Sequence, residues 1–255
     1  MTDPSTASAR PRLTFFFPAF NEEENIERTV ERALAEIGPL VPSIEVLAID
    51  DGSTDRTPEL ADALAAADPR VRVHHQPNRG YGGALKAGFE NARGELICFS
   101  DGDLQFDLRE MSRLLDRLAD TRKPVDGVIG YRIQRRDPFH RIFIAKTYNA
   151  IVSIAFGLRV RDIDCAMKLF RRELFDGLRL DAEGPFLSAE LLIKLRANGV
   201  RLAQVGVNHY PRAAGQNTGA SFRKILRTFR DLAVLRWALW TNREAVLRRS
   251  DQASG

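Results

Sequence analysis

The sequence predicts an α/β protein built on a mostly parallel β-sheet with helices on both faces. Between Leu13 and Gly130, short apolar segments alternate with segments whose apolar residues recur at helical spacing. The apolar segments are nearly unbroken, as in Leu96-Ile-Cys-Phe99, which is typical of strands buried on both faces. Several end abruptly in acidic or amide residues, and in parallel sheets ligands bind beyond the carboxyl ends of the strands. The same pattern therefore predicts the fold and the edge that carries a site.

The first predicted strand is Leu13–Phe17, which Pro18 closes. Asn21 is expected to cap a helix whose first turn carries three glutamates, Glu22 to Glu24, because acids favour the positive end of a helix dipole. Gly38-Pro39 is expected to end this helix.

The second predicted strand, Ile44–Ile49, ends in Asp50 and Asp51. Gly52 permits a tight turn after it. A helix that runs to Ala67 then follows. Its cap is expected from one of three polar residues, Ser53, Thr54 or Asp55.

A third strand, Val71–His74, precedes the glycine-rich segment 78–83, which opens a helix containing Lys86. The glycine spacing matches neither the dinucleotide-binding fingerprint nor a P-loop, so by itself this segment predicts only a flexible turn into a helix. A fourth strand at 96–99, a helix over about 108–119 and a fifth strand at 127–130 continue the alternation.

The fourth strand ends in Asp101 and Asp103, one residue apart, followed by Gln105 and Asp107. In an extended segment alternate side chains point the same way, so both carboxylates can converge on a cation. Hard oxygen ligands suit Mg²⁺ or Mn²⁺, which would hold a diphosphate. A polar turn and a phospho-aspartate nucleophile stay open as alternatives. A calcium loop is disfavoured because Phe106 and Ser112 stand where it needs Gly and Glu.

The composition is that of an ordinary globular chain: 255 residues, 44% hydrophobic, 28% charged, with a net charge of +4. Cys98 and Cys165 lie far apart, which indicates buried thiols in a reducing compartment and neither a disulfide framework nor a zinc site. Residues 1–11 are expected to be a disordered tail and not a signal peptide. No stretch reaches the roughly 18 uninterrupted apolar residues of a membrane span, so we expect no integral segment.

Four blocks together resemble the inverting family 2 glycosyltransferases: Phe17-Pro-Ala-Phe-Asn-Glu-Glu-Glu-Asn25, Ile49-Asp-Asp-Gly-Ser-Thr-Asp55, Asn78-Arg-Gly80 and Ser100-Asp-Gly-Asp-Leu-Gln105. Within that family the chain looks most like the dolichyl- and polyprenyl-phosphate sugar synthases. Later segments match this branch as well: Gly130-Tyr-Arg132, Arg141, Asp162–Arg172 and His209-Tyr-Pro-Arg212. The resemblance covers about residues 13–222.

The resemblance implies a nucleotide-diphosphosugar transferase (GT-A, Rossmann-like) fold over residues 12–215, with Mg²⁺ or Mn²⁺ at the Asp-x-Asp motif. It places the nucleotide-sugar beside nine residues: Pro18, Asn21, Glu22, Asp50, Asp51, Asn78, Asp101, Gly102 and Asp103. It assigns Asp101, Asp103 and Gln105 to the metal. Arg132, Arg141 and Arg212 match basic positions that hold phosphates, and Asp101, Asp103, Arg132 and Arg212 are the implied catalytic residues.

Three acidic residues have two interpretations each. Glu190 lies near the catalytic base of other branches of the family, but it also fits the first turn of a helix capped by Ser188. Asp162 and Asp164 can be site residues or loop caps. Asp164-Cys-Ala-Met-Lys168 also departs from the Thr-Ser-Gly-Phe-Arg-like run of the lipid-phosphate synthases, which weakens inference about acceptor and sugar.

The region 216–249 is predicted to be a basic amphipathic helical region, in which a flexible loop over 216–221 precedes a helix over about 222–240, and a short tail follows at 250–255. Its apolar face contains Phe222, Ile225, Leu226, Phe229, Leu232, Ala233 and Trp237. Basic residues lie largely off that face, a pattern of interfacial membrane helices. The alternative is a helix that packs on the core, on a second copy or on a membrane protein. The arginines accompany no nucleic-acid recognition motif, so we expect no nucleic-acid partner.

The predicted function is transfer of a hexose from a nucleoside diphosphate of GDP-mannose or UDP-glucose type to a polyprenyl or dolichyl phosphate. The predicted location is the cytoplasmic face of the cell membrane, as a peripheral protein. A hydroxyl acceptor of a cell-wall glycan or small metabolite is the alternative, and it requires a carboxylate base. A non-catalytic scaffold is disfavoured by the intact Asp101–Asp103 pair.

Overall fold

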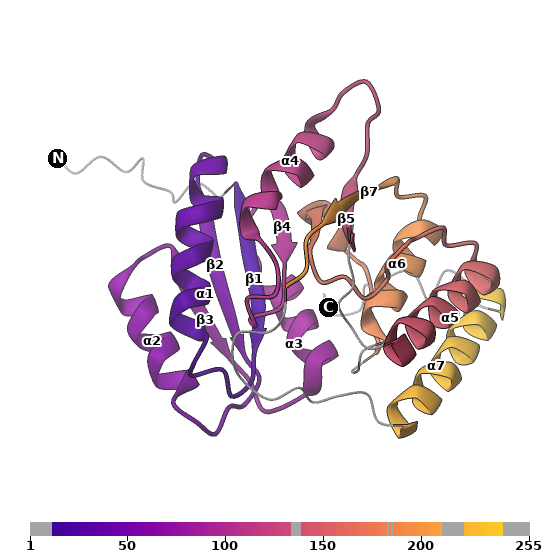
Figure 1. Ribbon diagram of the computed structural model, residues 1–255, viewed down its shortest axis with the longest axis horizontal. Coiled ribbons are helices and arrows are strands. Elements are labelled where there is room, and N and C mark those ends of the chain that lie inside the picture. The colour runs from indigo at the N-terminus through magenta and orange to yellow at the C-terminus, as the bar shows by residue number, and fades with distance from the viewer. Residues whose placement is uncertain (1–11, 134–138, 183, 185, 211–221, 242–255) are drawn as a thin grey trace, which may run out of the picture.

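The computed structural model describes residues 12–133, 139–182, 184, 186–210 and 222–241. Within them, seven strands form one sheet in the order β3-β2-β1-β4-β6-β5-β7 (Figure 1). The strands are β1 (Leu13–Ala19), β2 (Ile44–Asp50), β3 (Val71–His75), β4 (Leu96–Phe99), β5 (Gly127–Arg132), β6 (Lys168–Arg171) and β7 (Leu202–Val207). The α-helices are α1 (Ile26–Arg32), α2 (Thr57–Ala67), α3 (Gly80–Asn91), α4 (Met111–Ala119), α5 (Phe139–Phe156), α6 (Leu187–Ala197) and α7 (Phe222–Thr241).

All strands are parallel except β6, which runs antiparallel to both of its neighbours. Lys168, the first residue of β6, pairs with Phe99 in β4 and with Ile129 in β5. β6 therefore begins at the edge of the sheet where the other strands end. The predicted mostly parallel α/β sheet is confirmed.

The connections place helices on both faces. The chain steps from β1 through α1 to β2, and through α2 to β3, always in the same direction along the sheet. It then returns past β2 and β1 through α3 to reach β4. Because parallel crossovers are right-handed, α1 and α2 cover one face and α3 covers the other.

The core centres on the aromatic residues of β1 and β4. Phe16 stacks on Phe99 with ring centroids 5.4 Å apart, and Phe89 of α3 meets both rings edge to face. Gly88 allows this contact, because a Cβ atom there would lie 2.1 Å from the Phe16 ring. Large buried rings on a close-packed interface fix how far α3 lies from the sheet.

The first helix differs from its prediction. Asn21 does not cap it: α1 begins at Ile26, so Glu22, Glu23 and Glu24 lie in the preceding turn and not in the first helical turn. Asn21 instead has a left-handed backbone, with φ of 54°. The helix continues as a π-helical turn, Ala33–Ile37, and a 3₁₀ turn, Gly38–Leu40, so its end near Gly38 is close to the prediction.

The C-terminal helix α7 lies beside α5 (Figure 1). Leu232 and Leu235 are buried, whereas Trp237 is 65% exposed and Trp240 is 78% exposed. The predicted apolar face is therefore divided, since Leu232 packs against the protein and Trp237 does not. None of the described helices is long and apolar enough to cross a membrane.

Candidate functional site

The carboxyl ends of all strands except β6 meet at one edge of the sheet. The register fixes this edge, because Ala19 pairs with Asp50 and Phe16 pairs with Phe99. The residues that follow β1, β2 and β4 therefore lie side by side. The prediction that the acidic strand ends share one edge is confirmed.

The loop after β4 places Asp101 and Asp103 at this edge. The Tyr81 hydroxyl donates to Asp101 Oδ1 (3.0 Å), and the backbone N–H of Gln105 donates to Asp103 Oδ1 (3.2 Å). Asp103 is buried and Asp101 is half-buried. Burial, and then the negative charge of Asp101, raise the pKa of Tyr81, so this phenol stays protonated and keeps its donor.

The loop is held tightly against β1 and α1. A Cβ atom on Gly102 would lie 3.0 Å from the Phe17 ring and 3.0 Å from the carbonyl oxygen of Pro18. The carbonyl of Gly102 accepts a hydrogen bond from the buried Thr29 hydroxyl (3.0 Å). A small residue between the two aspartates lets the loop lie this close to the strand.

The segment after β7 clamps the far side of the loop. Gln105 donates its side-chain amide to the Tyr210 carbonyl (2.9 Å), and Tyr210 N–H donates to the Gln105 carbonyl (2.8 Å). The Phe106 and His209 rings meet edge to face, 5.1 Å apart. Gln105, predicted as a metal ligand, thus uses its amide nitrogen to hold the His209 segment beside the acidic loop.

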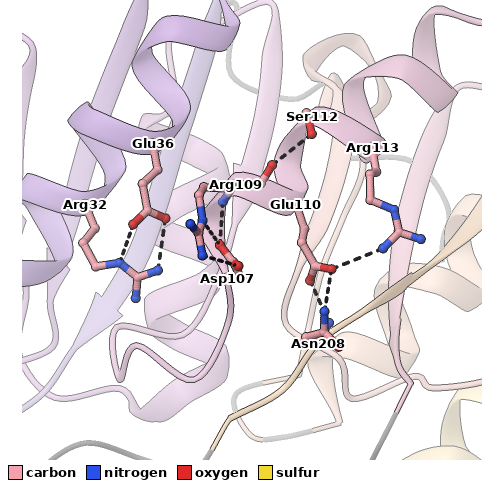
Figure 2. A network of polar contacts seen from close by, with 8 residues as sticks. All are labelled: Arg32, Glu36, Asp107, Arg109, Glu110, Ser112, Arg113 and Asn208. Carbon is pink, nitrogen blue, oxygen red and sulfur yellow. Dashed lines mark hydrogen bonds and ion pairs between the residues drawn. The ribbon is translucent and has the colours of Figure 1, made fainter.

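A polar network connects the same segment to the start of α4 (Figure 2). Glu110 accepts from the backbone N–H of Asn208 (2.7 Å) and from its side chain (3.0 Å), and Arg113 pairs with Glu110 at 3.2 Å. Asp107 accepts from the Arg109 N–H (3.1 Å) and pairs with the Arg109 guanidinium. Of the acids on this loop, Asp107 therefore serves the turn that leads into α4.

Asp50, at the end of β2, is buried and shapes its own turn. Its carboxylate accepts from Ser53 N–H (3.0 Å) and lies 2.8 Å from Nδ1 of His75. Nε2 of the same imidazole lies 3.1 Å from Asp62. The hydrogen bond with Asp50 raises the pKa of His75, with Asp62 acting in the same direction.

Asp51 joins the β2 end to the loop before α3. Its Oδ1 accepts from the Gln76 amide (2.6 Å) and from the Arg79 N–H (2.8 Å). The Asn78 side chain accepts from Gly80 N–H (3.1 Å) and so shapes the start of α3. Gly52 is required here, since its φ is +73° and a Cβ atom would lie 2.7 Å from the Asn78 nitrogen. The segment predicted as a flexible turn is in fact tied to the β2 edge.

Asn21 and Glu22 bind the turn after β2. The Asn21 side chain accepts from Thr54 N–H (2.8 Å), and Asn21 N–H donates to Ser53 Oγ (3.0 Å). Glu22 N–H donates to Thr57 Oγ1 (2.8 Å). These bonds close one wall of the edge beside Pro18. None of the three predicted caps of α2 is at the N-cap position, which Arg56 occupies, although Asp55 accepts a hydrogen bond from the Thr57 N–H (2.9 Å).

Arg132, at the end of β5, forms a forked pair with Asp162. Its Nε and Nη2 donate to the two carboxylate oxygens at 2.7 and 2.8 Å. Burial disfavours the guanidinium charge, but the Asp162 hydrogen bonds and charge outweigh it and raise the pKa of Arg132. Asp162 therefore has a structural task, which is to hold Arg132 at the edge. Two other predicted phosphate-binding residues lie outside the description: Arg212 entirely, and the side chain of Arg141.

Glu190 lies inside a buried ion pair. The N–H groups of Asp181 and Ala182 donate to its carboxylate at 2.8 to 3.1 Å, and Lys194 Nζ lies 2.7 Å away. Both Glu190 and Lys194 are buried. Ser188 does not cap α6, because the helix begins one residue earlier, at Leu187. The cap prediction is wrong, although the helical position of Glu190 is as predicted.

The donor set at the acidic loop fits a divalent cation shared with a ligand. Among the described residues, no three His, Cys, Asp or Glu side chains are arranged to hold a metal by themselves. Asp101 and Asp103 offer hard oxygens, and the buried Ser100 hydroxyl beside them has no hydrogen-bond partner in the described structure. A cation here would complete its coordination with oxygens of a bound diphosphate and water.

A comparison with known families decides the class of this protein. Residues 14–179 match the family described as glycosyl transferase family 2. The chain belongs to glycosyl transferase family 2. This family 2 glycosyltransferase is 31% identical over 239 residues to the polyprenol monophosphomannose synthase of Mycolicibacterium smegmatis, covering 88% of each chain. The resemblance drawn from the sequence blocks is thereby confirmed.

Two longer relatives are also similar to this glycosyltransferase. Glycosyltransferase AglD of Haloferax volcanii is 34% identical over 218 residues, which is 82% of this chain and 34% of AglD. The undecaprenyl-phosphate 4-deoxy-4-formamido-L-arabinose transferase of Pseudomonas aeruginosa is 31% identical over 215 residues, 83% of this chain and 61% of that protein. The chain thus spans about a third of the first relative and under two thirds of the second.

Solved structures confirm the fold of this glycosyltransferase. Glucosyl-3-phosphoglycerate synthase from Mycobacterium tuberculosis, in complex with phosphoglyceric acid, matches with a TM-score of 0.65 over 89% of this chain and 79% of that chain, at 22% identity. The same enzyme has been solved with Mn²⁺ and UDP-glucose, and with Mg²⁺ and UDP. The GT-A fold predicted from the resemblance is therefore confirmed.

Sequence reasoning missed several residues at the edge. Tyr81 was counted only as part of a turn, yet it bonds Asp101. Thr29 belongs to no motif, and Lys168 stands in a matched block without a predicted role, although a threonine and a lysine in otherwise apolar faces are a usable signal. Lys168 is fully buried, donates to the Cys165 carbonyl and lies over the Phe99 ring at 5.2 Å.

Proposed function

We propose that this glycosyltransferase moves a hexose from a nucleoside diphosphate to a polyprenyl phosphate at the cytoplasmic surface of a membrane, with a divalent cation. The supporting observation is the shared edge: the Asp50–Asp51 turn follows β2 and the Asp101–Asp103 loop follows β4, and these two strands flank β1 and run parallel to it. A nucleoside-diphosphate sugar that spans this edge would place its nucleoside at the Asp50–Asp51 turn and its diphosphate at the Asp101–Asp103 loop.

In this proposal the nucleoside lies over β1 and β2. Pro18, Asn21, Glu22 and Asp51 border it, and the hydrogen bonds of Asn21 to Thr54 and of Asp51 to Arg79 N–H hold that wall rigid. A rigid wall lowers the entropic cost of binding. The diphosphate then reaches the loop after β4.

The leaving diphosphate is handled by the β4 loop. A cation held by Asp101 and Asp103 would act as a Lewis acid toward the negative charge that develops on the diphosphate. Tyr81 orients Asp101, and Thr29 fixes the backbone of Gly102 between the two carboxylates. These contacts preorganise the loop before substrate arrives.

A phosphate acceptor fits the surroundings of the loop. A lipid phosphate is already ionised near neutral pH, so its oxygen can attack the anomeric carbon directly. The carbon–oxygen bond to the diphosphate breaks, its electron pair stays on the departing oxygen, and the anomeric configuration inverts. Arg132, fixed by Asp162, is proposed to hold a phosphate through its remaining nitrogen, together with Arg141 and Arg212.

Two relatives support the acceptor by their names, a polyprenol monophosphomannose synthase and an undecaprenyl-phosphate sugar transferase. The hydroxyl-acceptor alternative needs a base, and Glu190 was its candidate. Glu190 forms an ion pair with Lys194 and accepts hydrogen bonds from two backbone N–H groups, which argues against its acting as a catalytic base.

The test is transfer of radiolabel. Purified protein with Mn²⁺ or Mg²⁺ is incubated with labelled GDP-mannose, UDP-glucose and related donors, with and without undecaprenyl or dolichyl phosphate. We expect label from one donor to enter the organic phase only when the lipid phosphate is present. Transfer or hydrolysis that ignores the lipid would contradict the lipid-phosphate acceptor and direct the search to hydroxyl acceptors.

A further inference from the structure

Strand β6 lies next to β4 in the sheet, on the side of β4 that is away from β1 and β2. If the nucleoside lies over β1 and β2 and the diphosphate lies at β4, the sugar extends over the next strand, which is β6. This inference rests on the proposed function. It concerns the segment 161–165, which leads into β6 at that place.

This segment is held in place from two sides. The Asn149 side chain in α5 donates to the Arg161 carbonyl (2.8 Å) and accepts from Ile163 N–H (3.4 Å). On the other side, Arg132 holds Asp162 through two hydrogen bonds. Ile163 and Cys165 are fully buried, whereas Asp164 between them is exposed. A carboxylate on a rigid segment thus faces outward beside the loop.

Tyr148, the residue before Asn149, supplies a second polar group. Its hydroxyl oxygen is buried and has no hydrogen-bond partner in the described part of the chain. A buried hydroxyl without a partner is unfavourable, and a bound ligand that supplies the missing hydrogen bond accounts for such a group. Because the next residue, Asn149, bonds both Arg161 and Ile163, Tyr148 lies beside the segment that carries Asp164. Burial, and then the charge of Asp164, raise the pKa of Tyr148.

Asp164 also lies near the residues of the acidic loop. Its charge acts on Tyr81, which donates to Asp101, and on the buried Lys168 beneath the loop. The charge of Asp164 therefore acts on two phenols: Tyr81, whose hydroxyl donates to Asp101, and Tyr148, whose hydroxyl has no partner among the described residues.

We propose that Asp164 and Tyr148 form a subsite that hydrogen-bonds to the hydroxyl groups of the donor sugar and selects a neutral hexose. A carboxylate accepts hydrogen bonds from two neighbouring hydroxyls, and the Tyr148 hydroxyl gains the partner that it lacks. A uronosyl donor carries its own carboxylate, which Asp164 repels. The subsite thus determines which sugar is transferred and leaves nucleotide binding to the other half of the edge.

The test compares Tyr148→Phe and Asp164→Asn with the wild type and with Asp176→Asn, an exposed acid at the other end of β6. For each protein we would measure kcat/KM with UDP-glucose, GDP-mannose and UDP-glucuronate, the Kd of UDP and GDP with Mn²⁺, and the Tm. Tyr148→Phe should lower kcat/KM for the hexosyl donor about tenfold. It should leave the nucleotide Kd within about twofold and leave Tm equal or higher, because no hydrogen bond is lost.

Asp164→Asn should lower kcat/KM for the hexosyl donor and raise the relative rate with UDP-glucuronate about tenfold, because like-charge repulsion is removed. If both variants have the same relative kcat/KM values for the three donors as the wild type, the subsite is overturned and the proposed function stays intact. A loss of nucleotide affinity as large as the loss of kcat/KM would also overturn the subsite, since such a loss would show that these residues have a general structural role. A wild type that binds neither UDP nor GDP with Mn²⁺ would overturn the proposed function and the subsite together.

Discussion

At the scale of single residues, His75 links the end of β2 to α2 through Asp50 and Asp62. Its pKa is raised in the folded protein, first by the Asp50 hydrogen bond. A raised pKa means that the stabilisation is complete below the unfolded value near pH 6.5 and is lost as pH rises through the folded value.

His75→Asn should therefore cost more free energy of unfolding at pH 5.5 than at pH 8.5. We expect a difference of about 0.5 kcal/mol, because the imidazole is partly exposed and solvent screens the pair. Urea unfolding at the two pH values measures it, with His74→Asn on the same strand as the control. An equal cost at both pH values would contradict the assigned pairs.

The residue scale also shows where sequence reasoning stops. Asp50, Asp51, Asp101 and Asp103 were placed at one edge from strand patterns alone, and the sheet register confirms this. Their partners could not be predicted, because Gln76 and Arg79 reach Asp51 from a neighbouring strand end. The sequence predicts Arg132 as a phosphate ligand but not its ion pair with Asp162. This pair forms because segment 161–165 lies beside β5 before the antiparallel strand β6 begins.

At the scale of elements, α6 depends on a buried pair. Lys194 and Glu190 lie one helical turn apart, with Lys194 also 3.0 Å from Asp181. Lys194→Met leaves the Glu190 charge buried without its partner. We expect a loss of about 3–5 kcal/mol in the free energy of unfolding.

The double variant Glu190→Gln/Lys194→Met should recover a large part of that loss and retain sugar transfer, because no charge is then left buried. Chemical denaturation and kcat measure the two effects. Arg196→Met, which removes an exposed cation from the same helix, is the control and should change stability little. A stable double variant without any turnover would contradict this structural role and would indicate that Glu190 is a catalytic base.

The elements themselves were largely predictable, because apolar strands and helical periodicity leave clear signals in residues 13–130. The start of α1 was not. Glu22 to Glu24 are favourable in a first helical turn, yet Glu22 N–H donates to Thr57, the first residue of α2, and Glu23 N–H donates to Asp55 in the turn before it. Tertiary hydrogen bonds to another loop outweigh a local preference of a few tenths of a kcal/mol to about 1 kcal/mol.

At the scale of the whole molecule, α5 and α7 together expose apolar side chains. Ile154 is 86% exposed, and Trp237 and Trp240 are also mostly exposed. The proposed lipid acceptor requires the protein to work at a membrane surface, where exposed tryptophans bury favourably. We expect the wild type to sediment with vesicles that contain anionic phospholipid.

Trp237→Glu/Trp240→Glu should weaken vesicle binding at least about tenfold. Two large apolar groups are lost, and the anionic phospholipid repels the two added carboxylates. Leu40→Glu, which alters an exposed apolar residue beyond α1, should bind like the wild type. Circular dichroism checks that both variants keep their helices. Equal binding by all three proteins would show that this face does not contact the membrane.

The central claim is that the loop after β4 binds a divalent cation together with the donor diphosphate. The most direct test is Mn²⁺ binding, followed by electron paramagnetic resonance, with and without GDP or UDP. Asp103→Asn and its matched control Asp107→Asn change two carboxylates of one loop, and only Asp107 is turned toward Arg109. We predict that nucleotide tightens Mn²⁺ binding in the wild type and in Asp107→Asn, and that Asp103→Asn abolishes this coupling. Coupling that survives in Asp103→Asn, or nucleotide binding that ignores Mn²⁺ in the wild type, would contradict the claim.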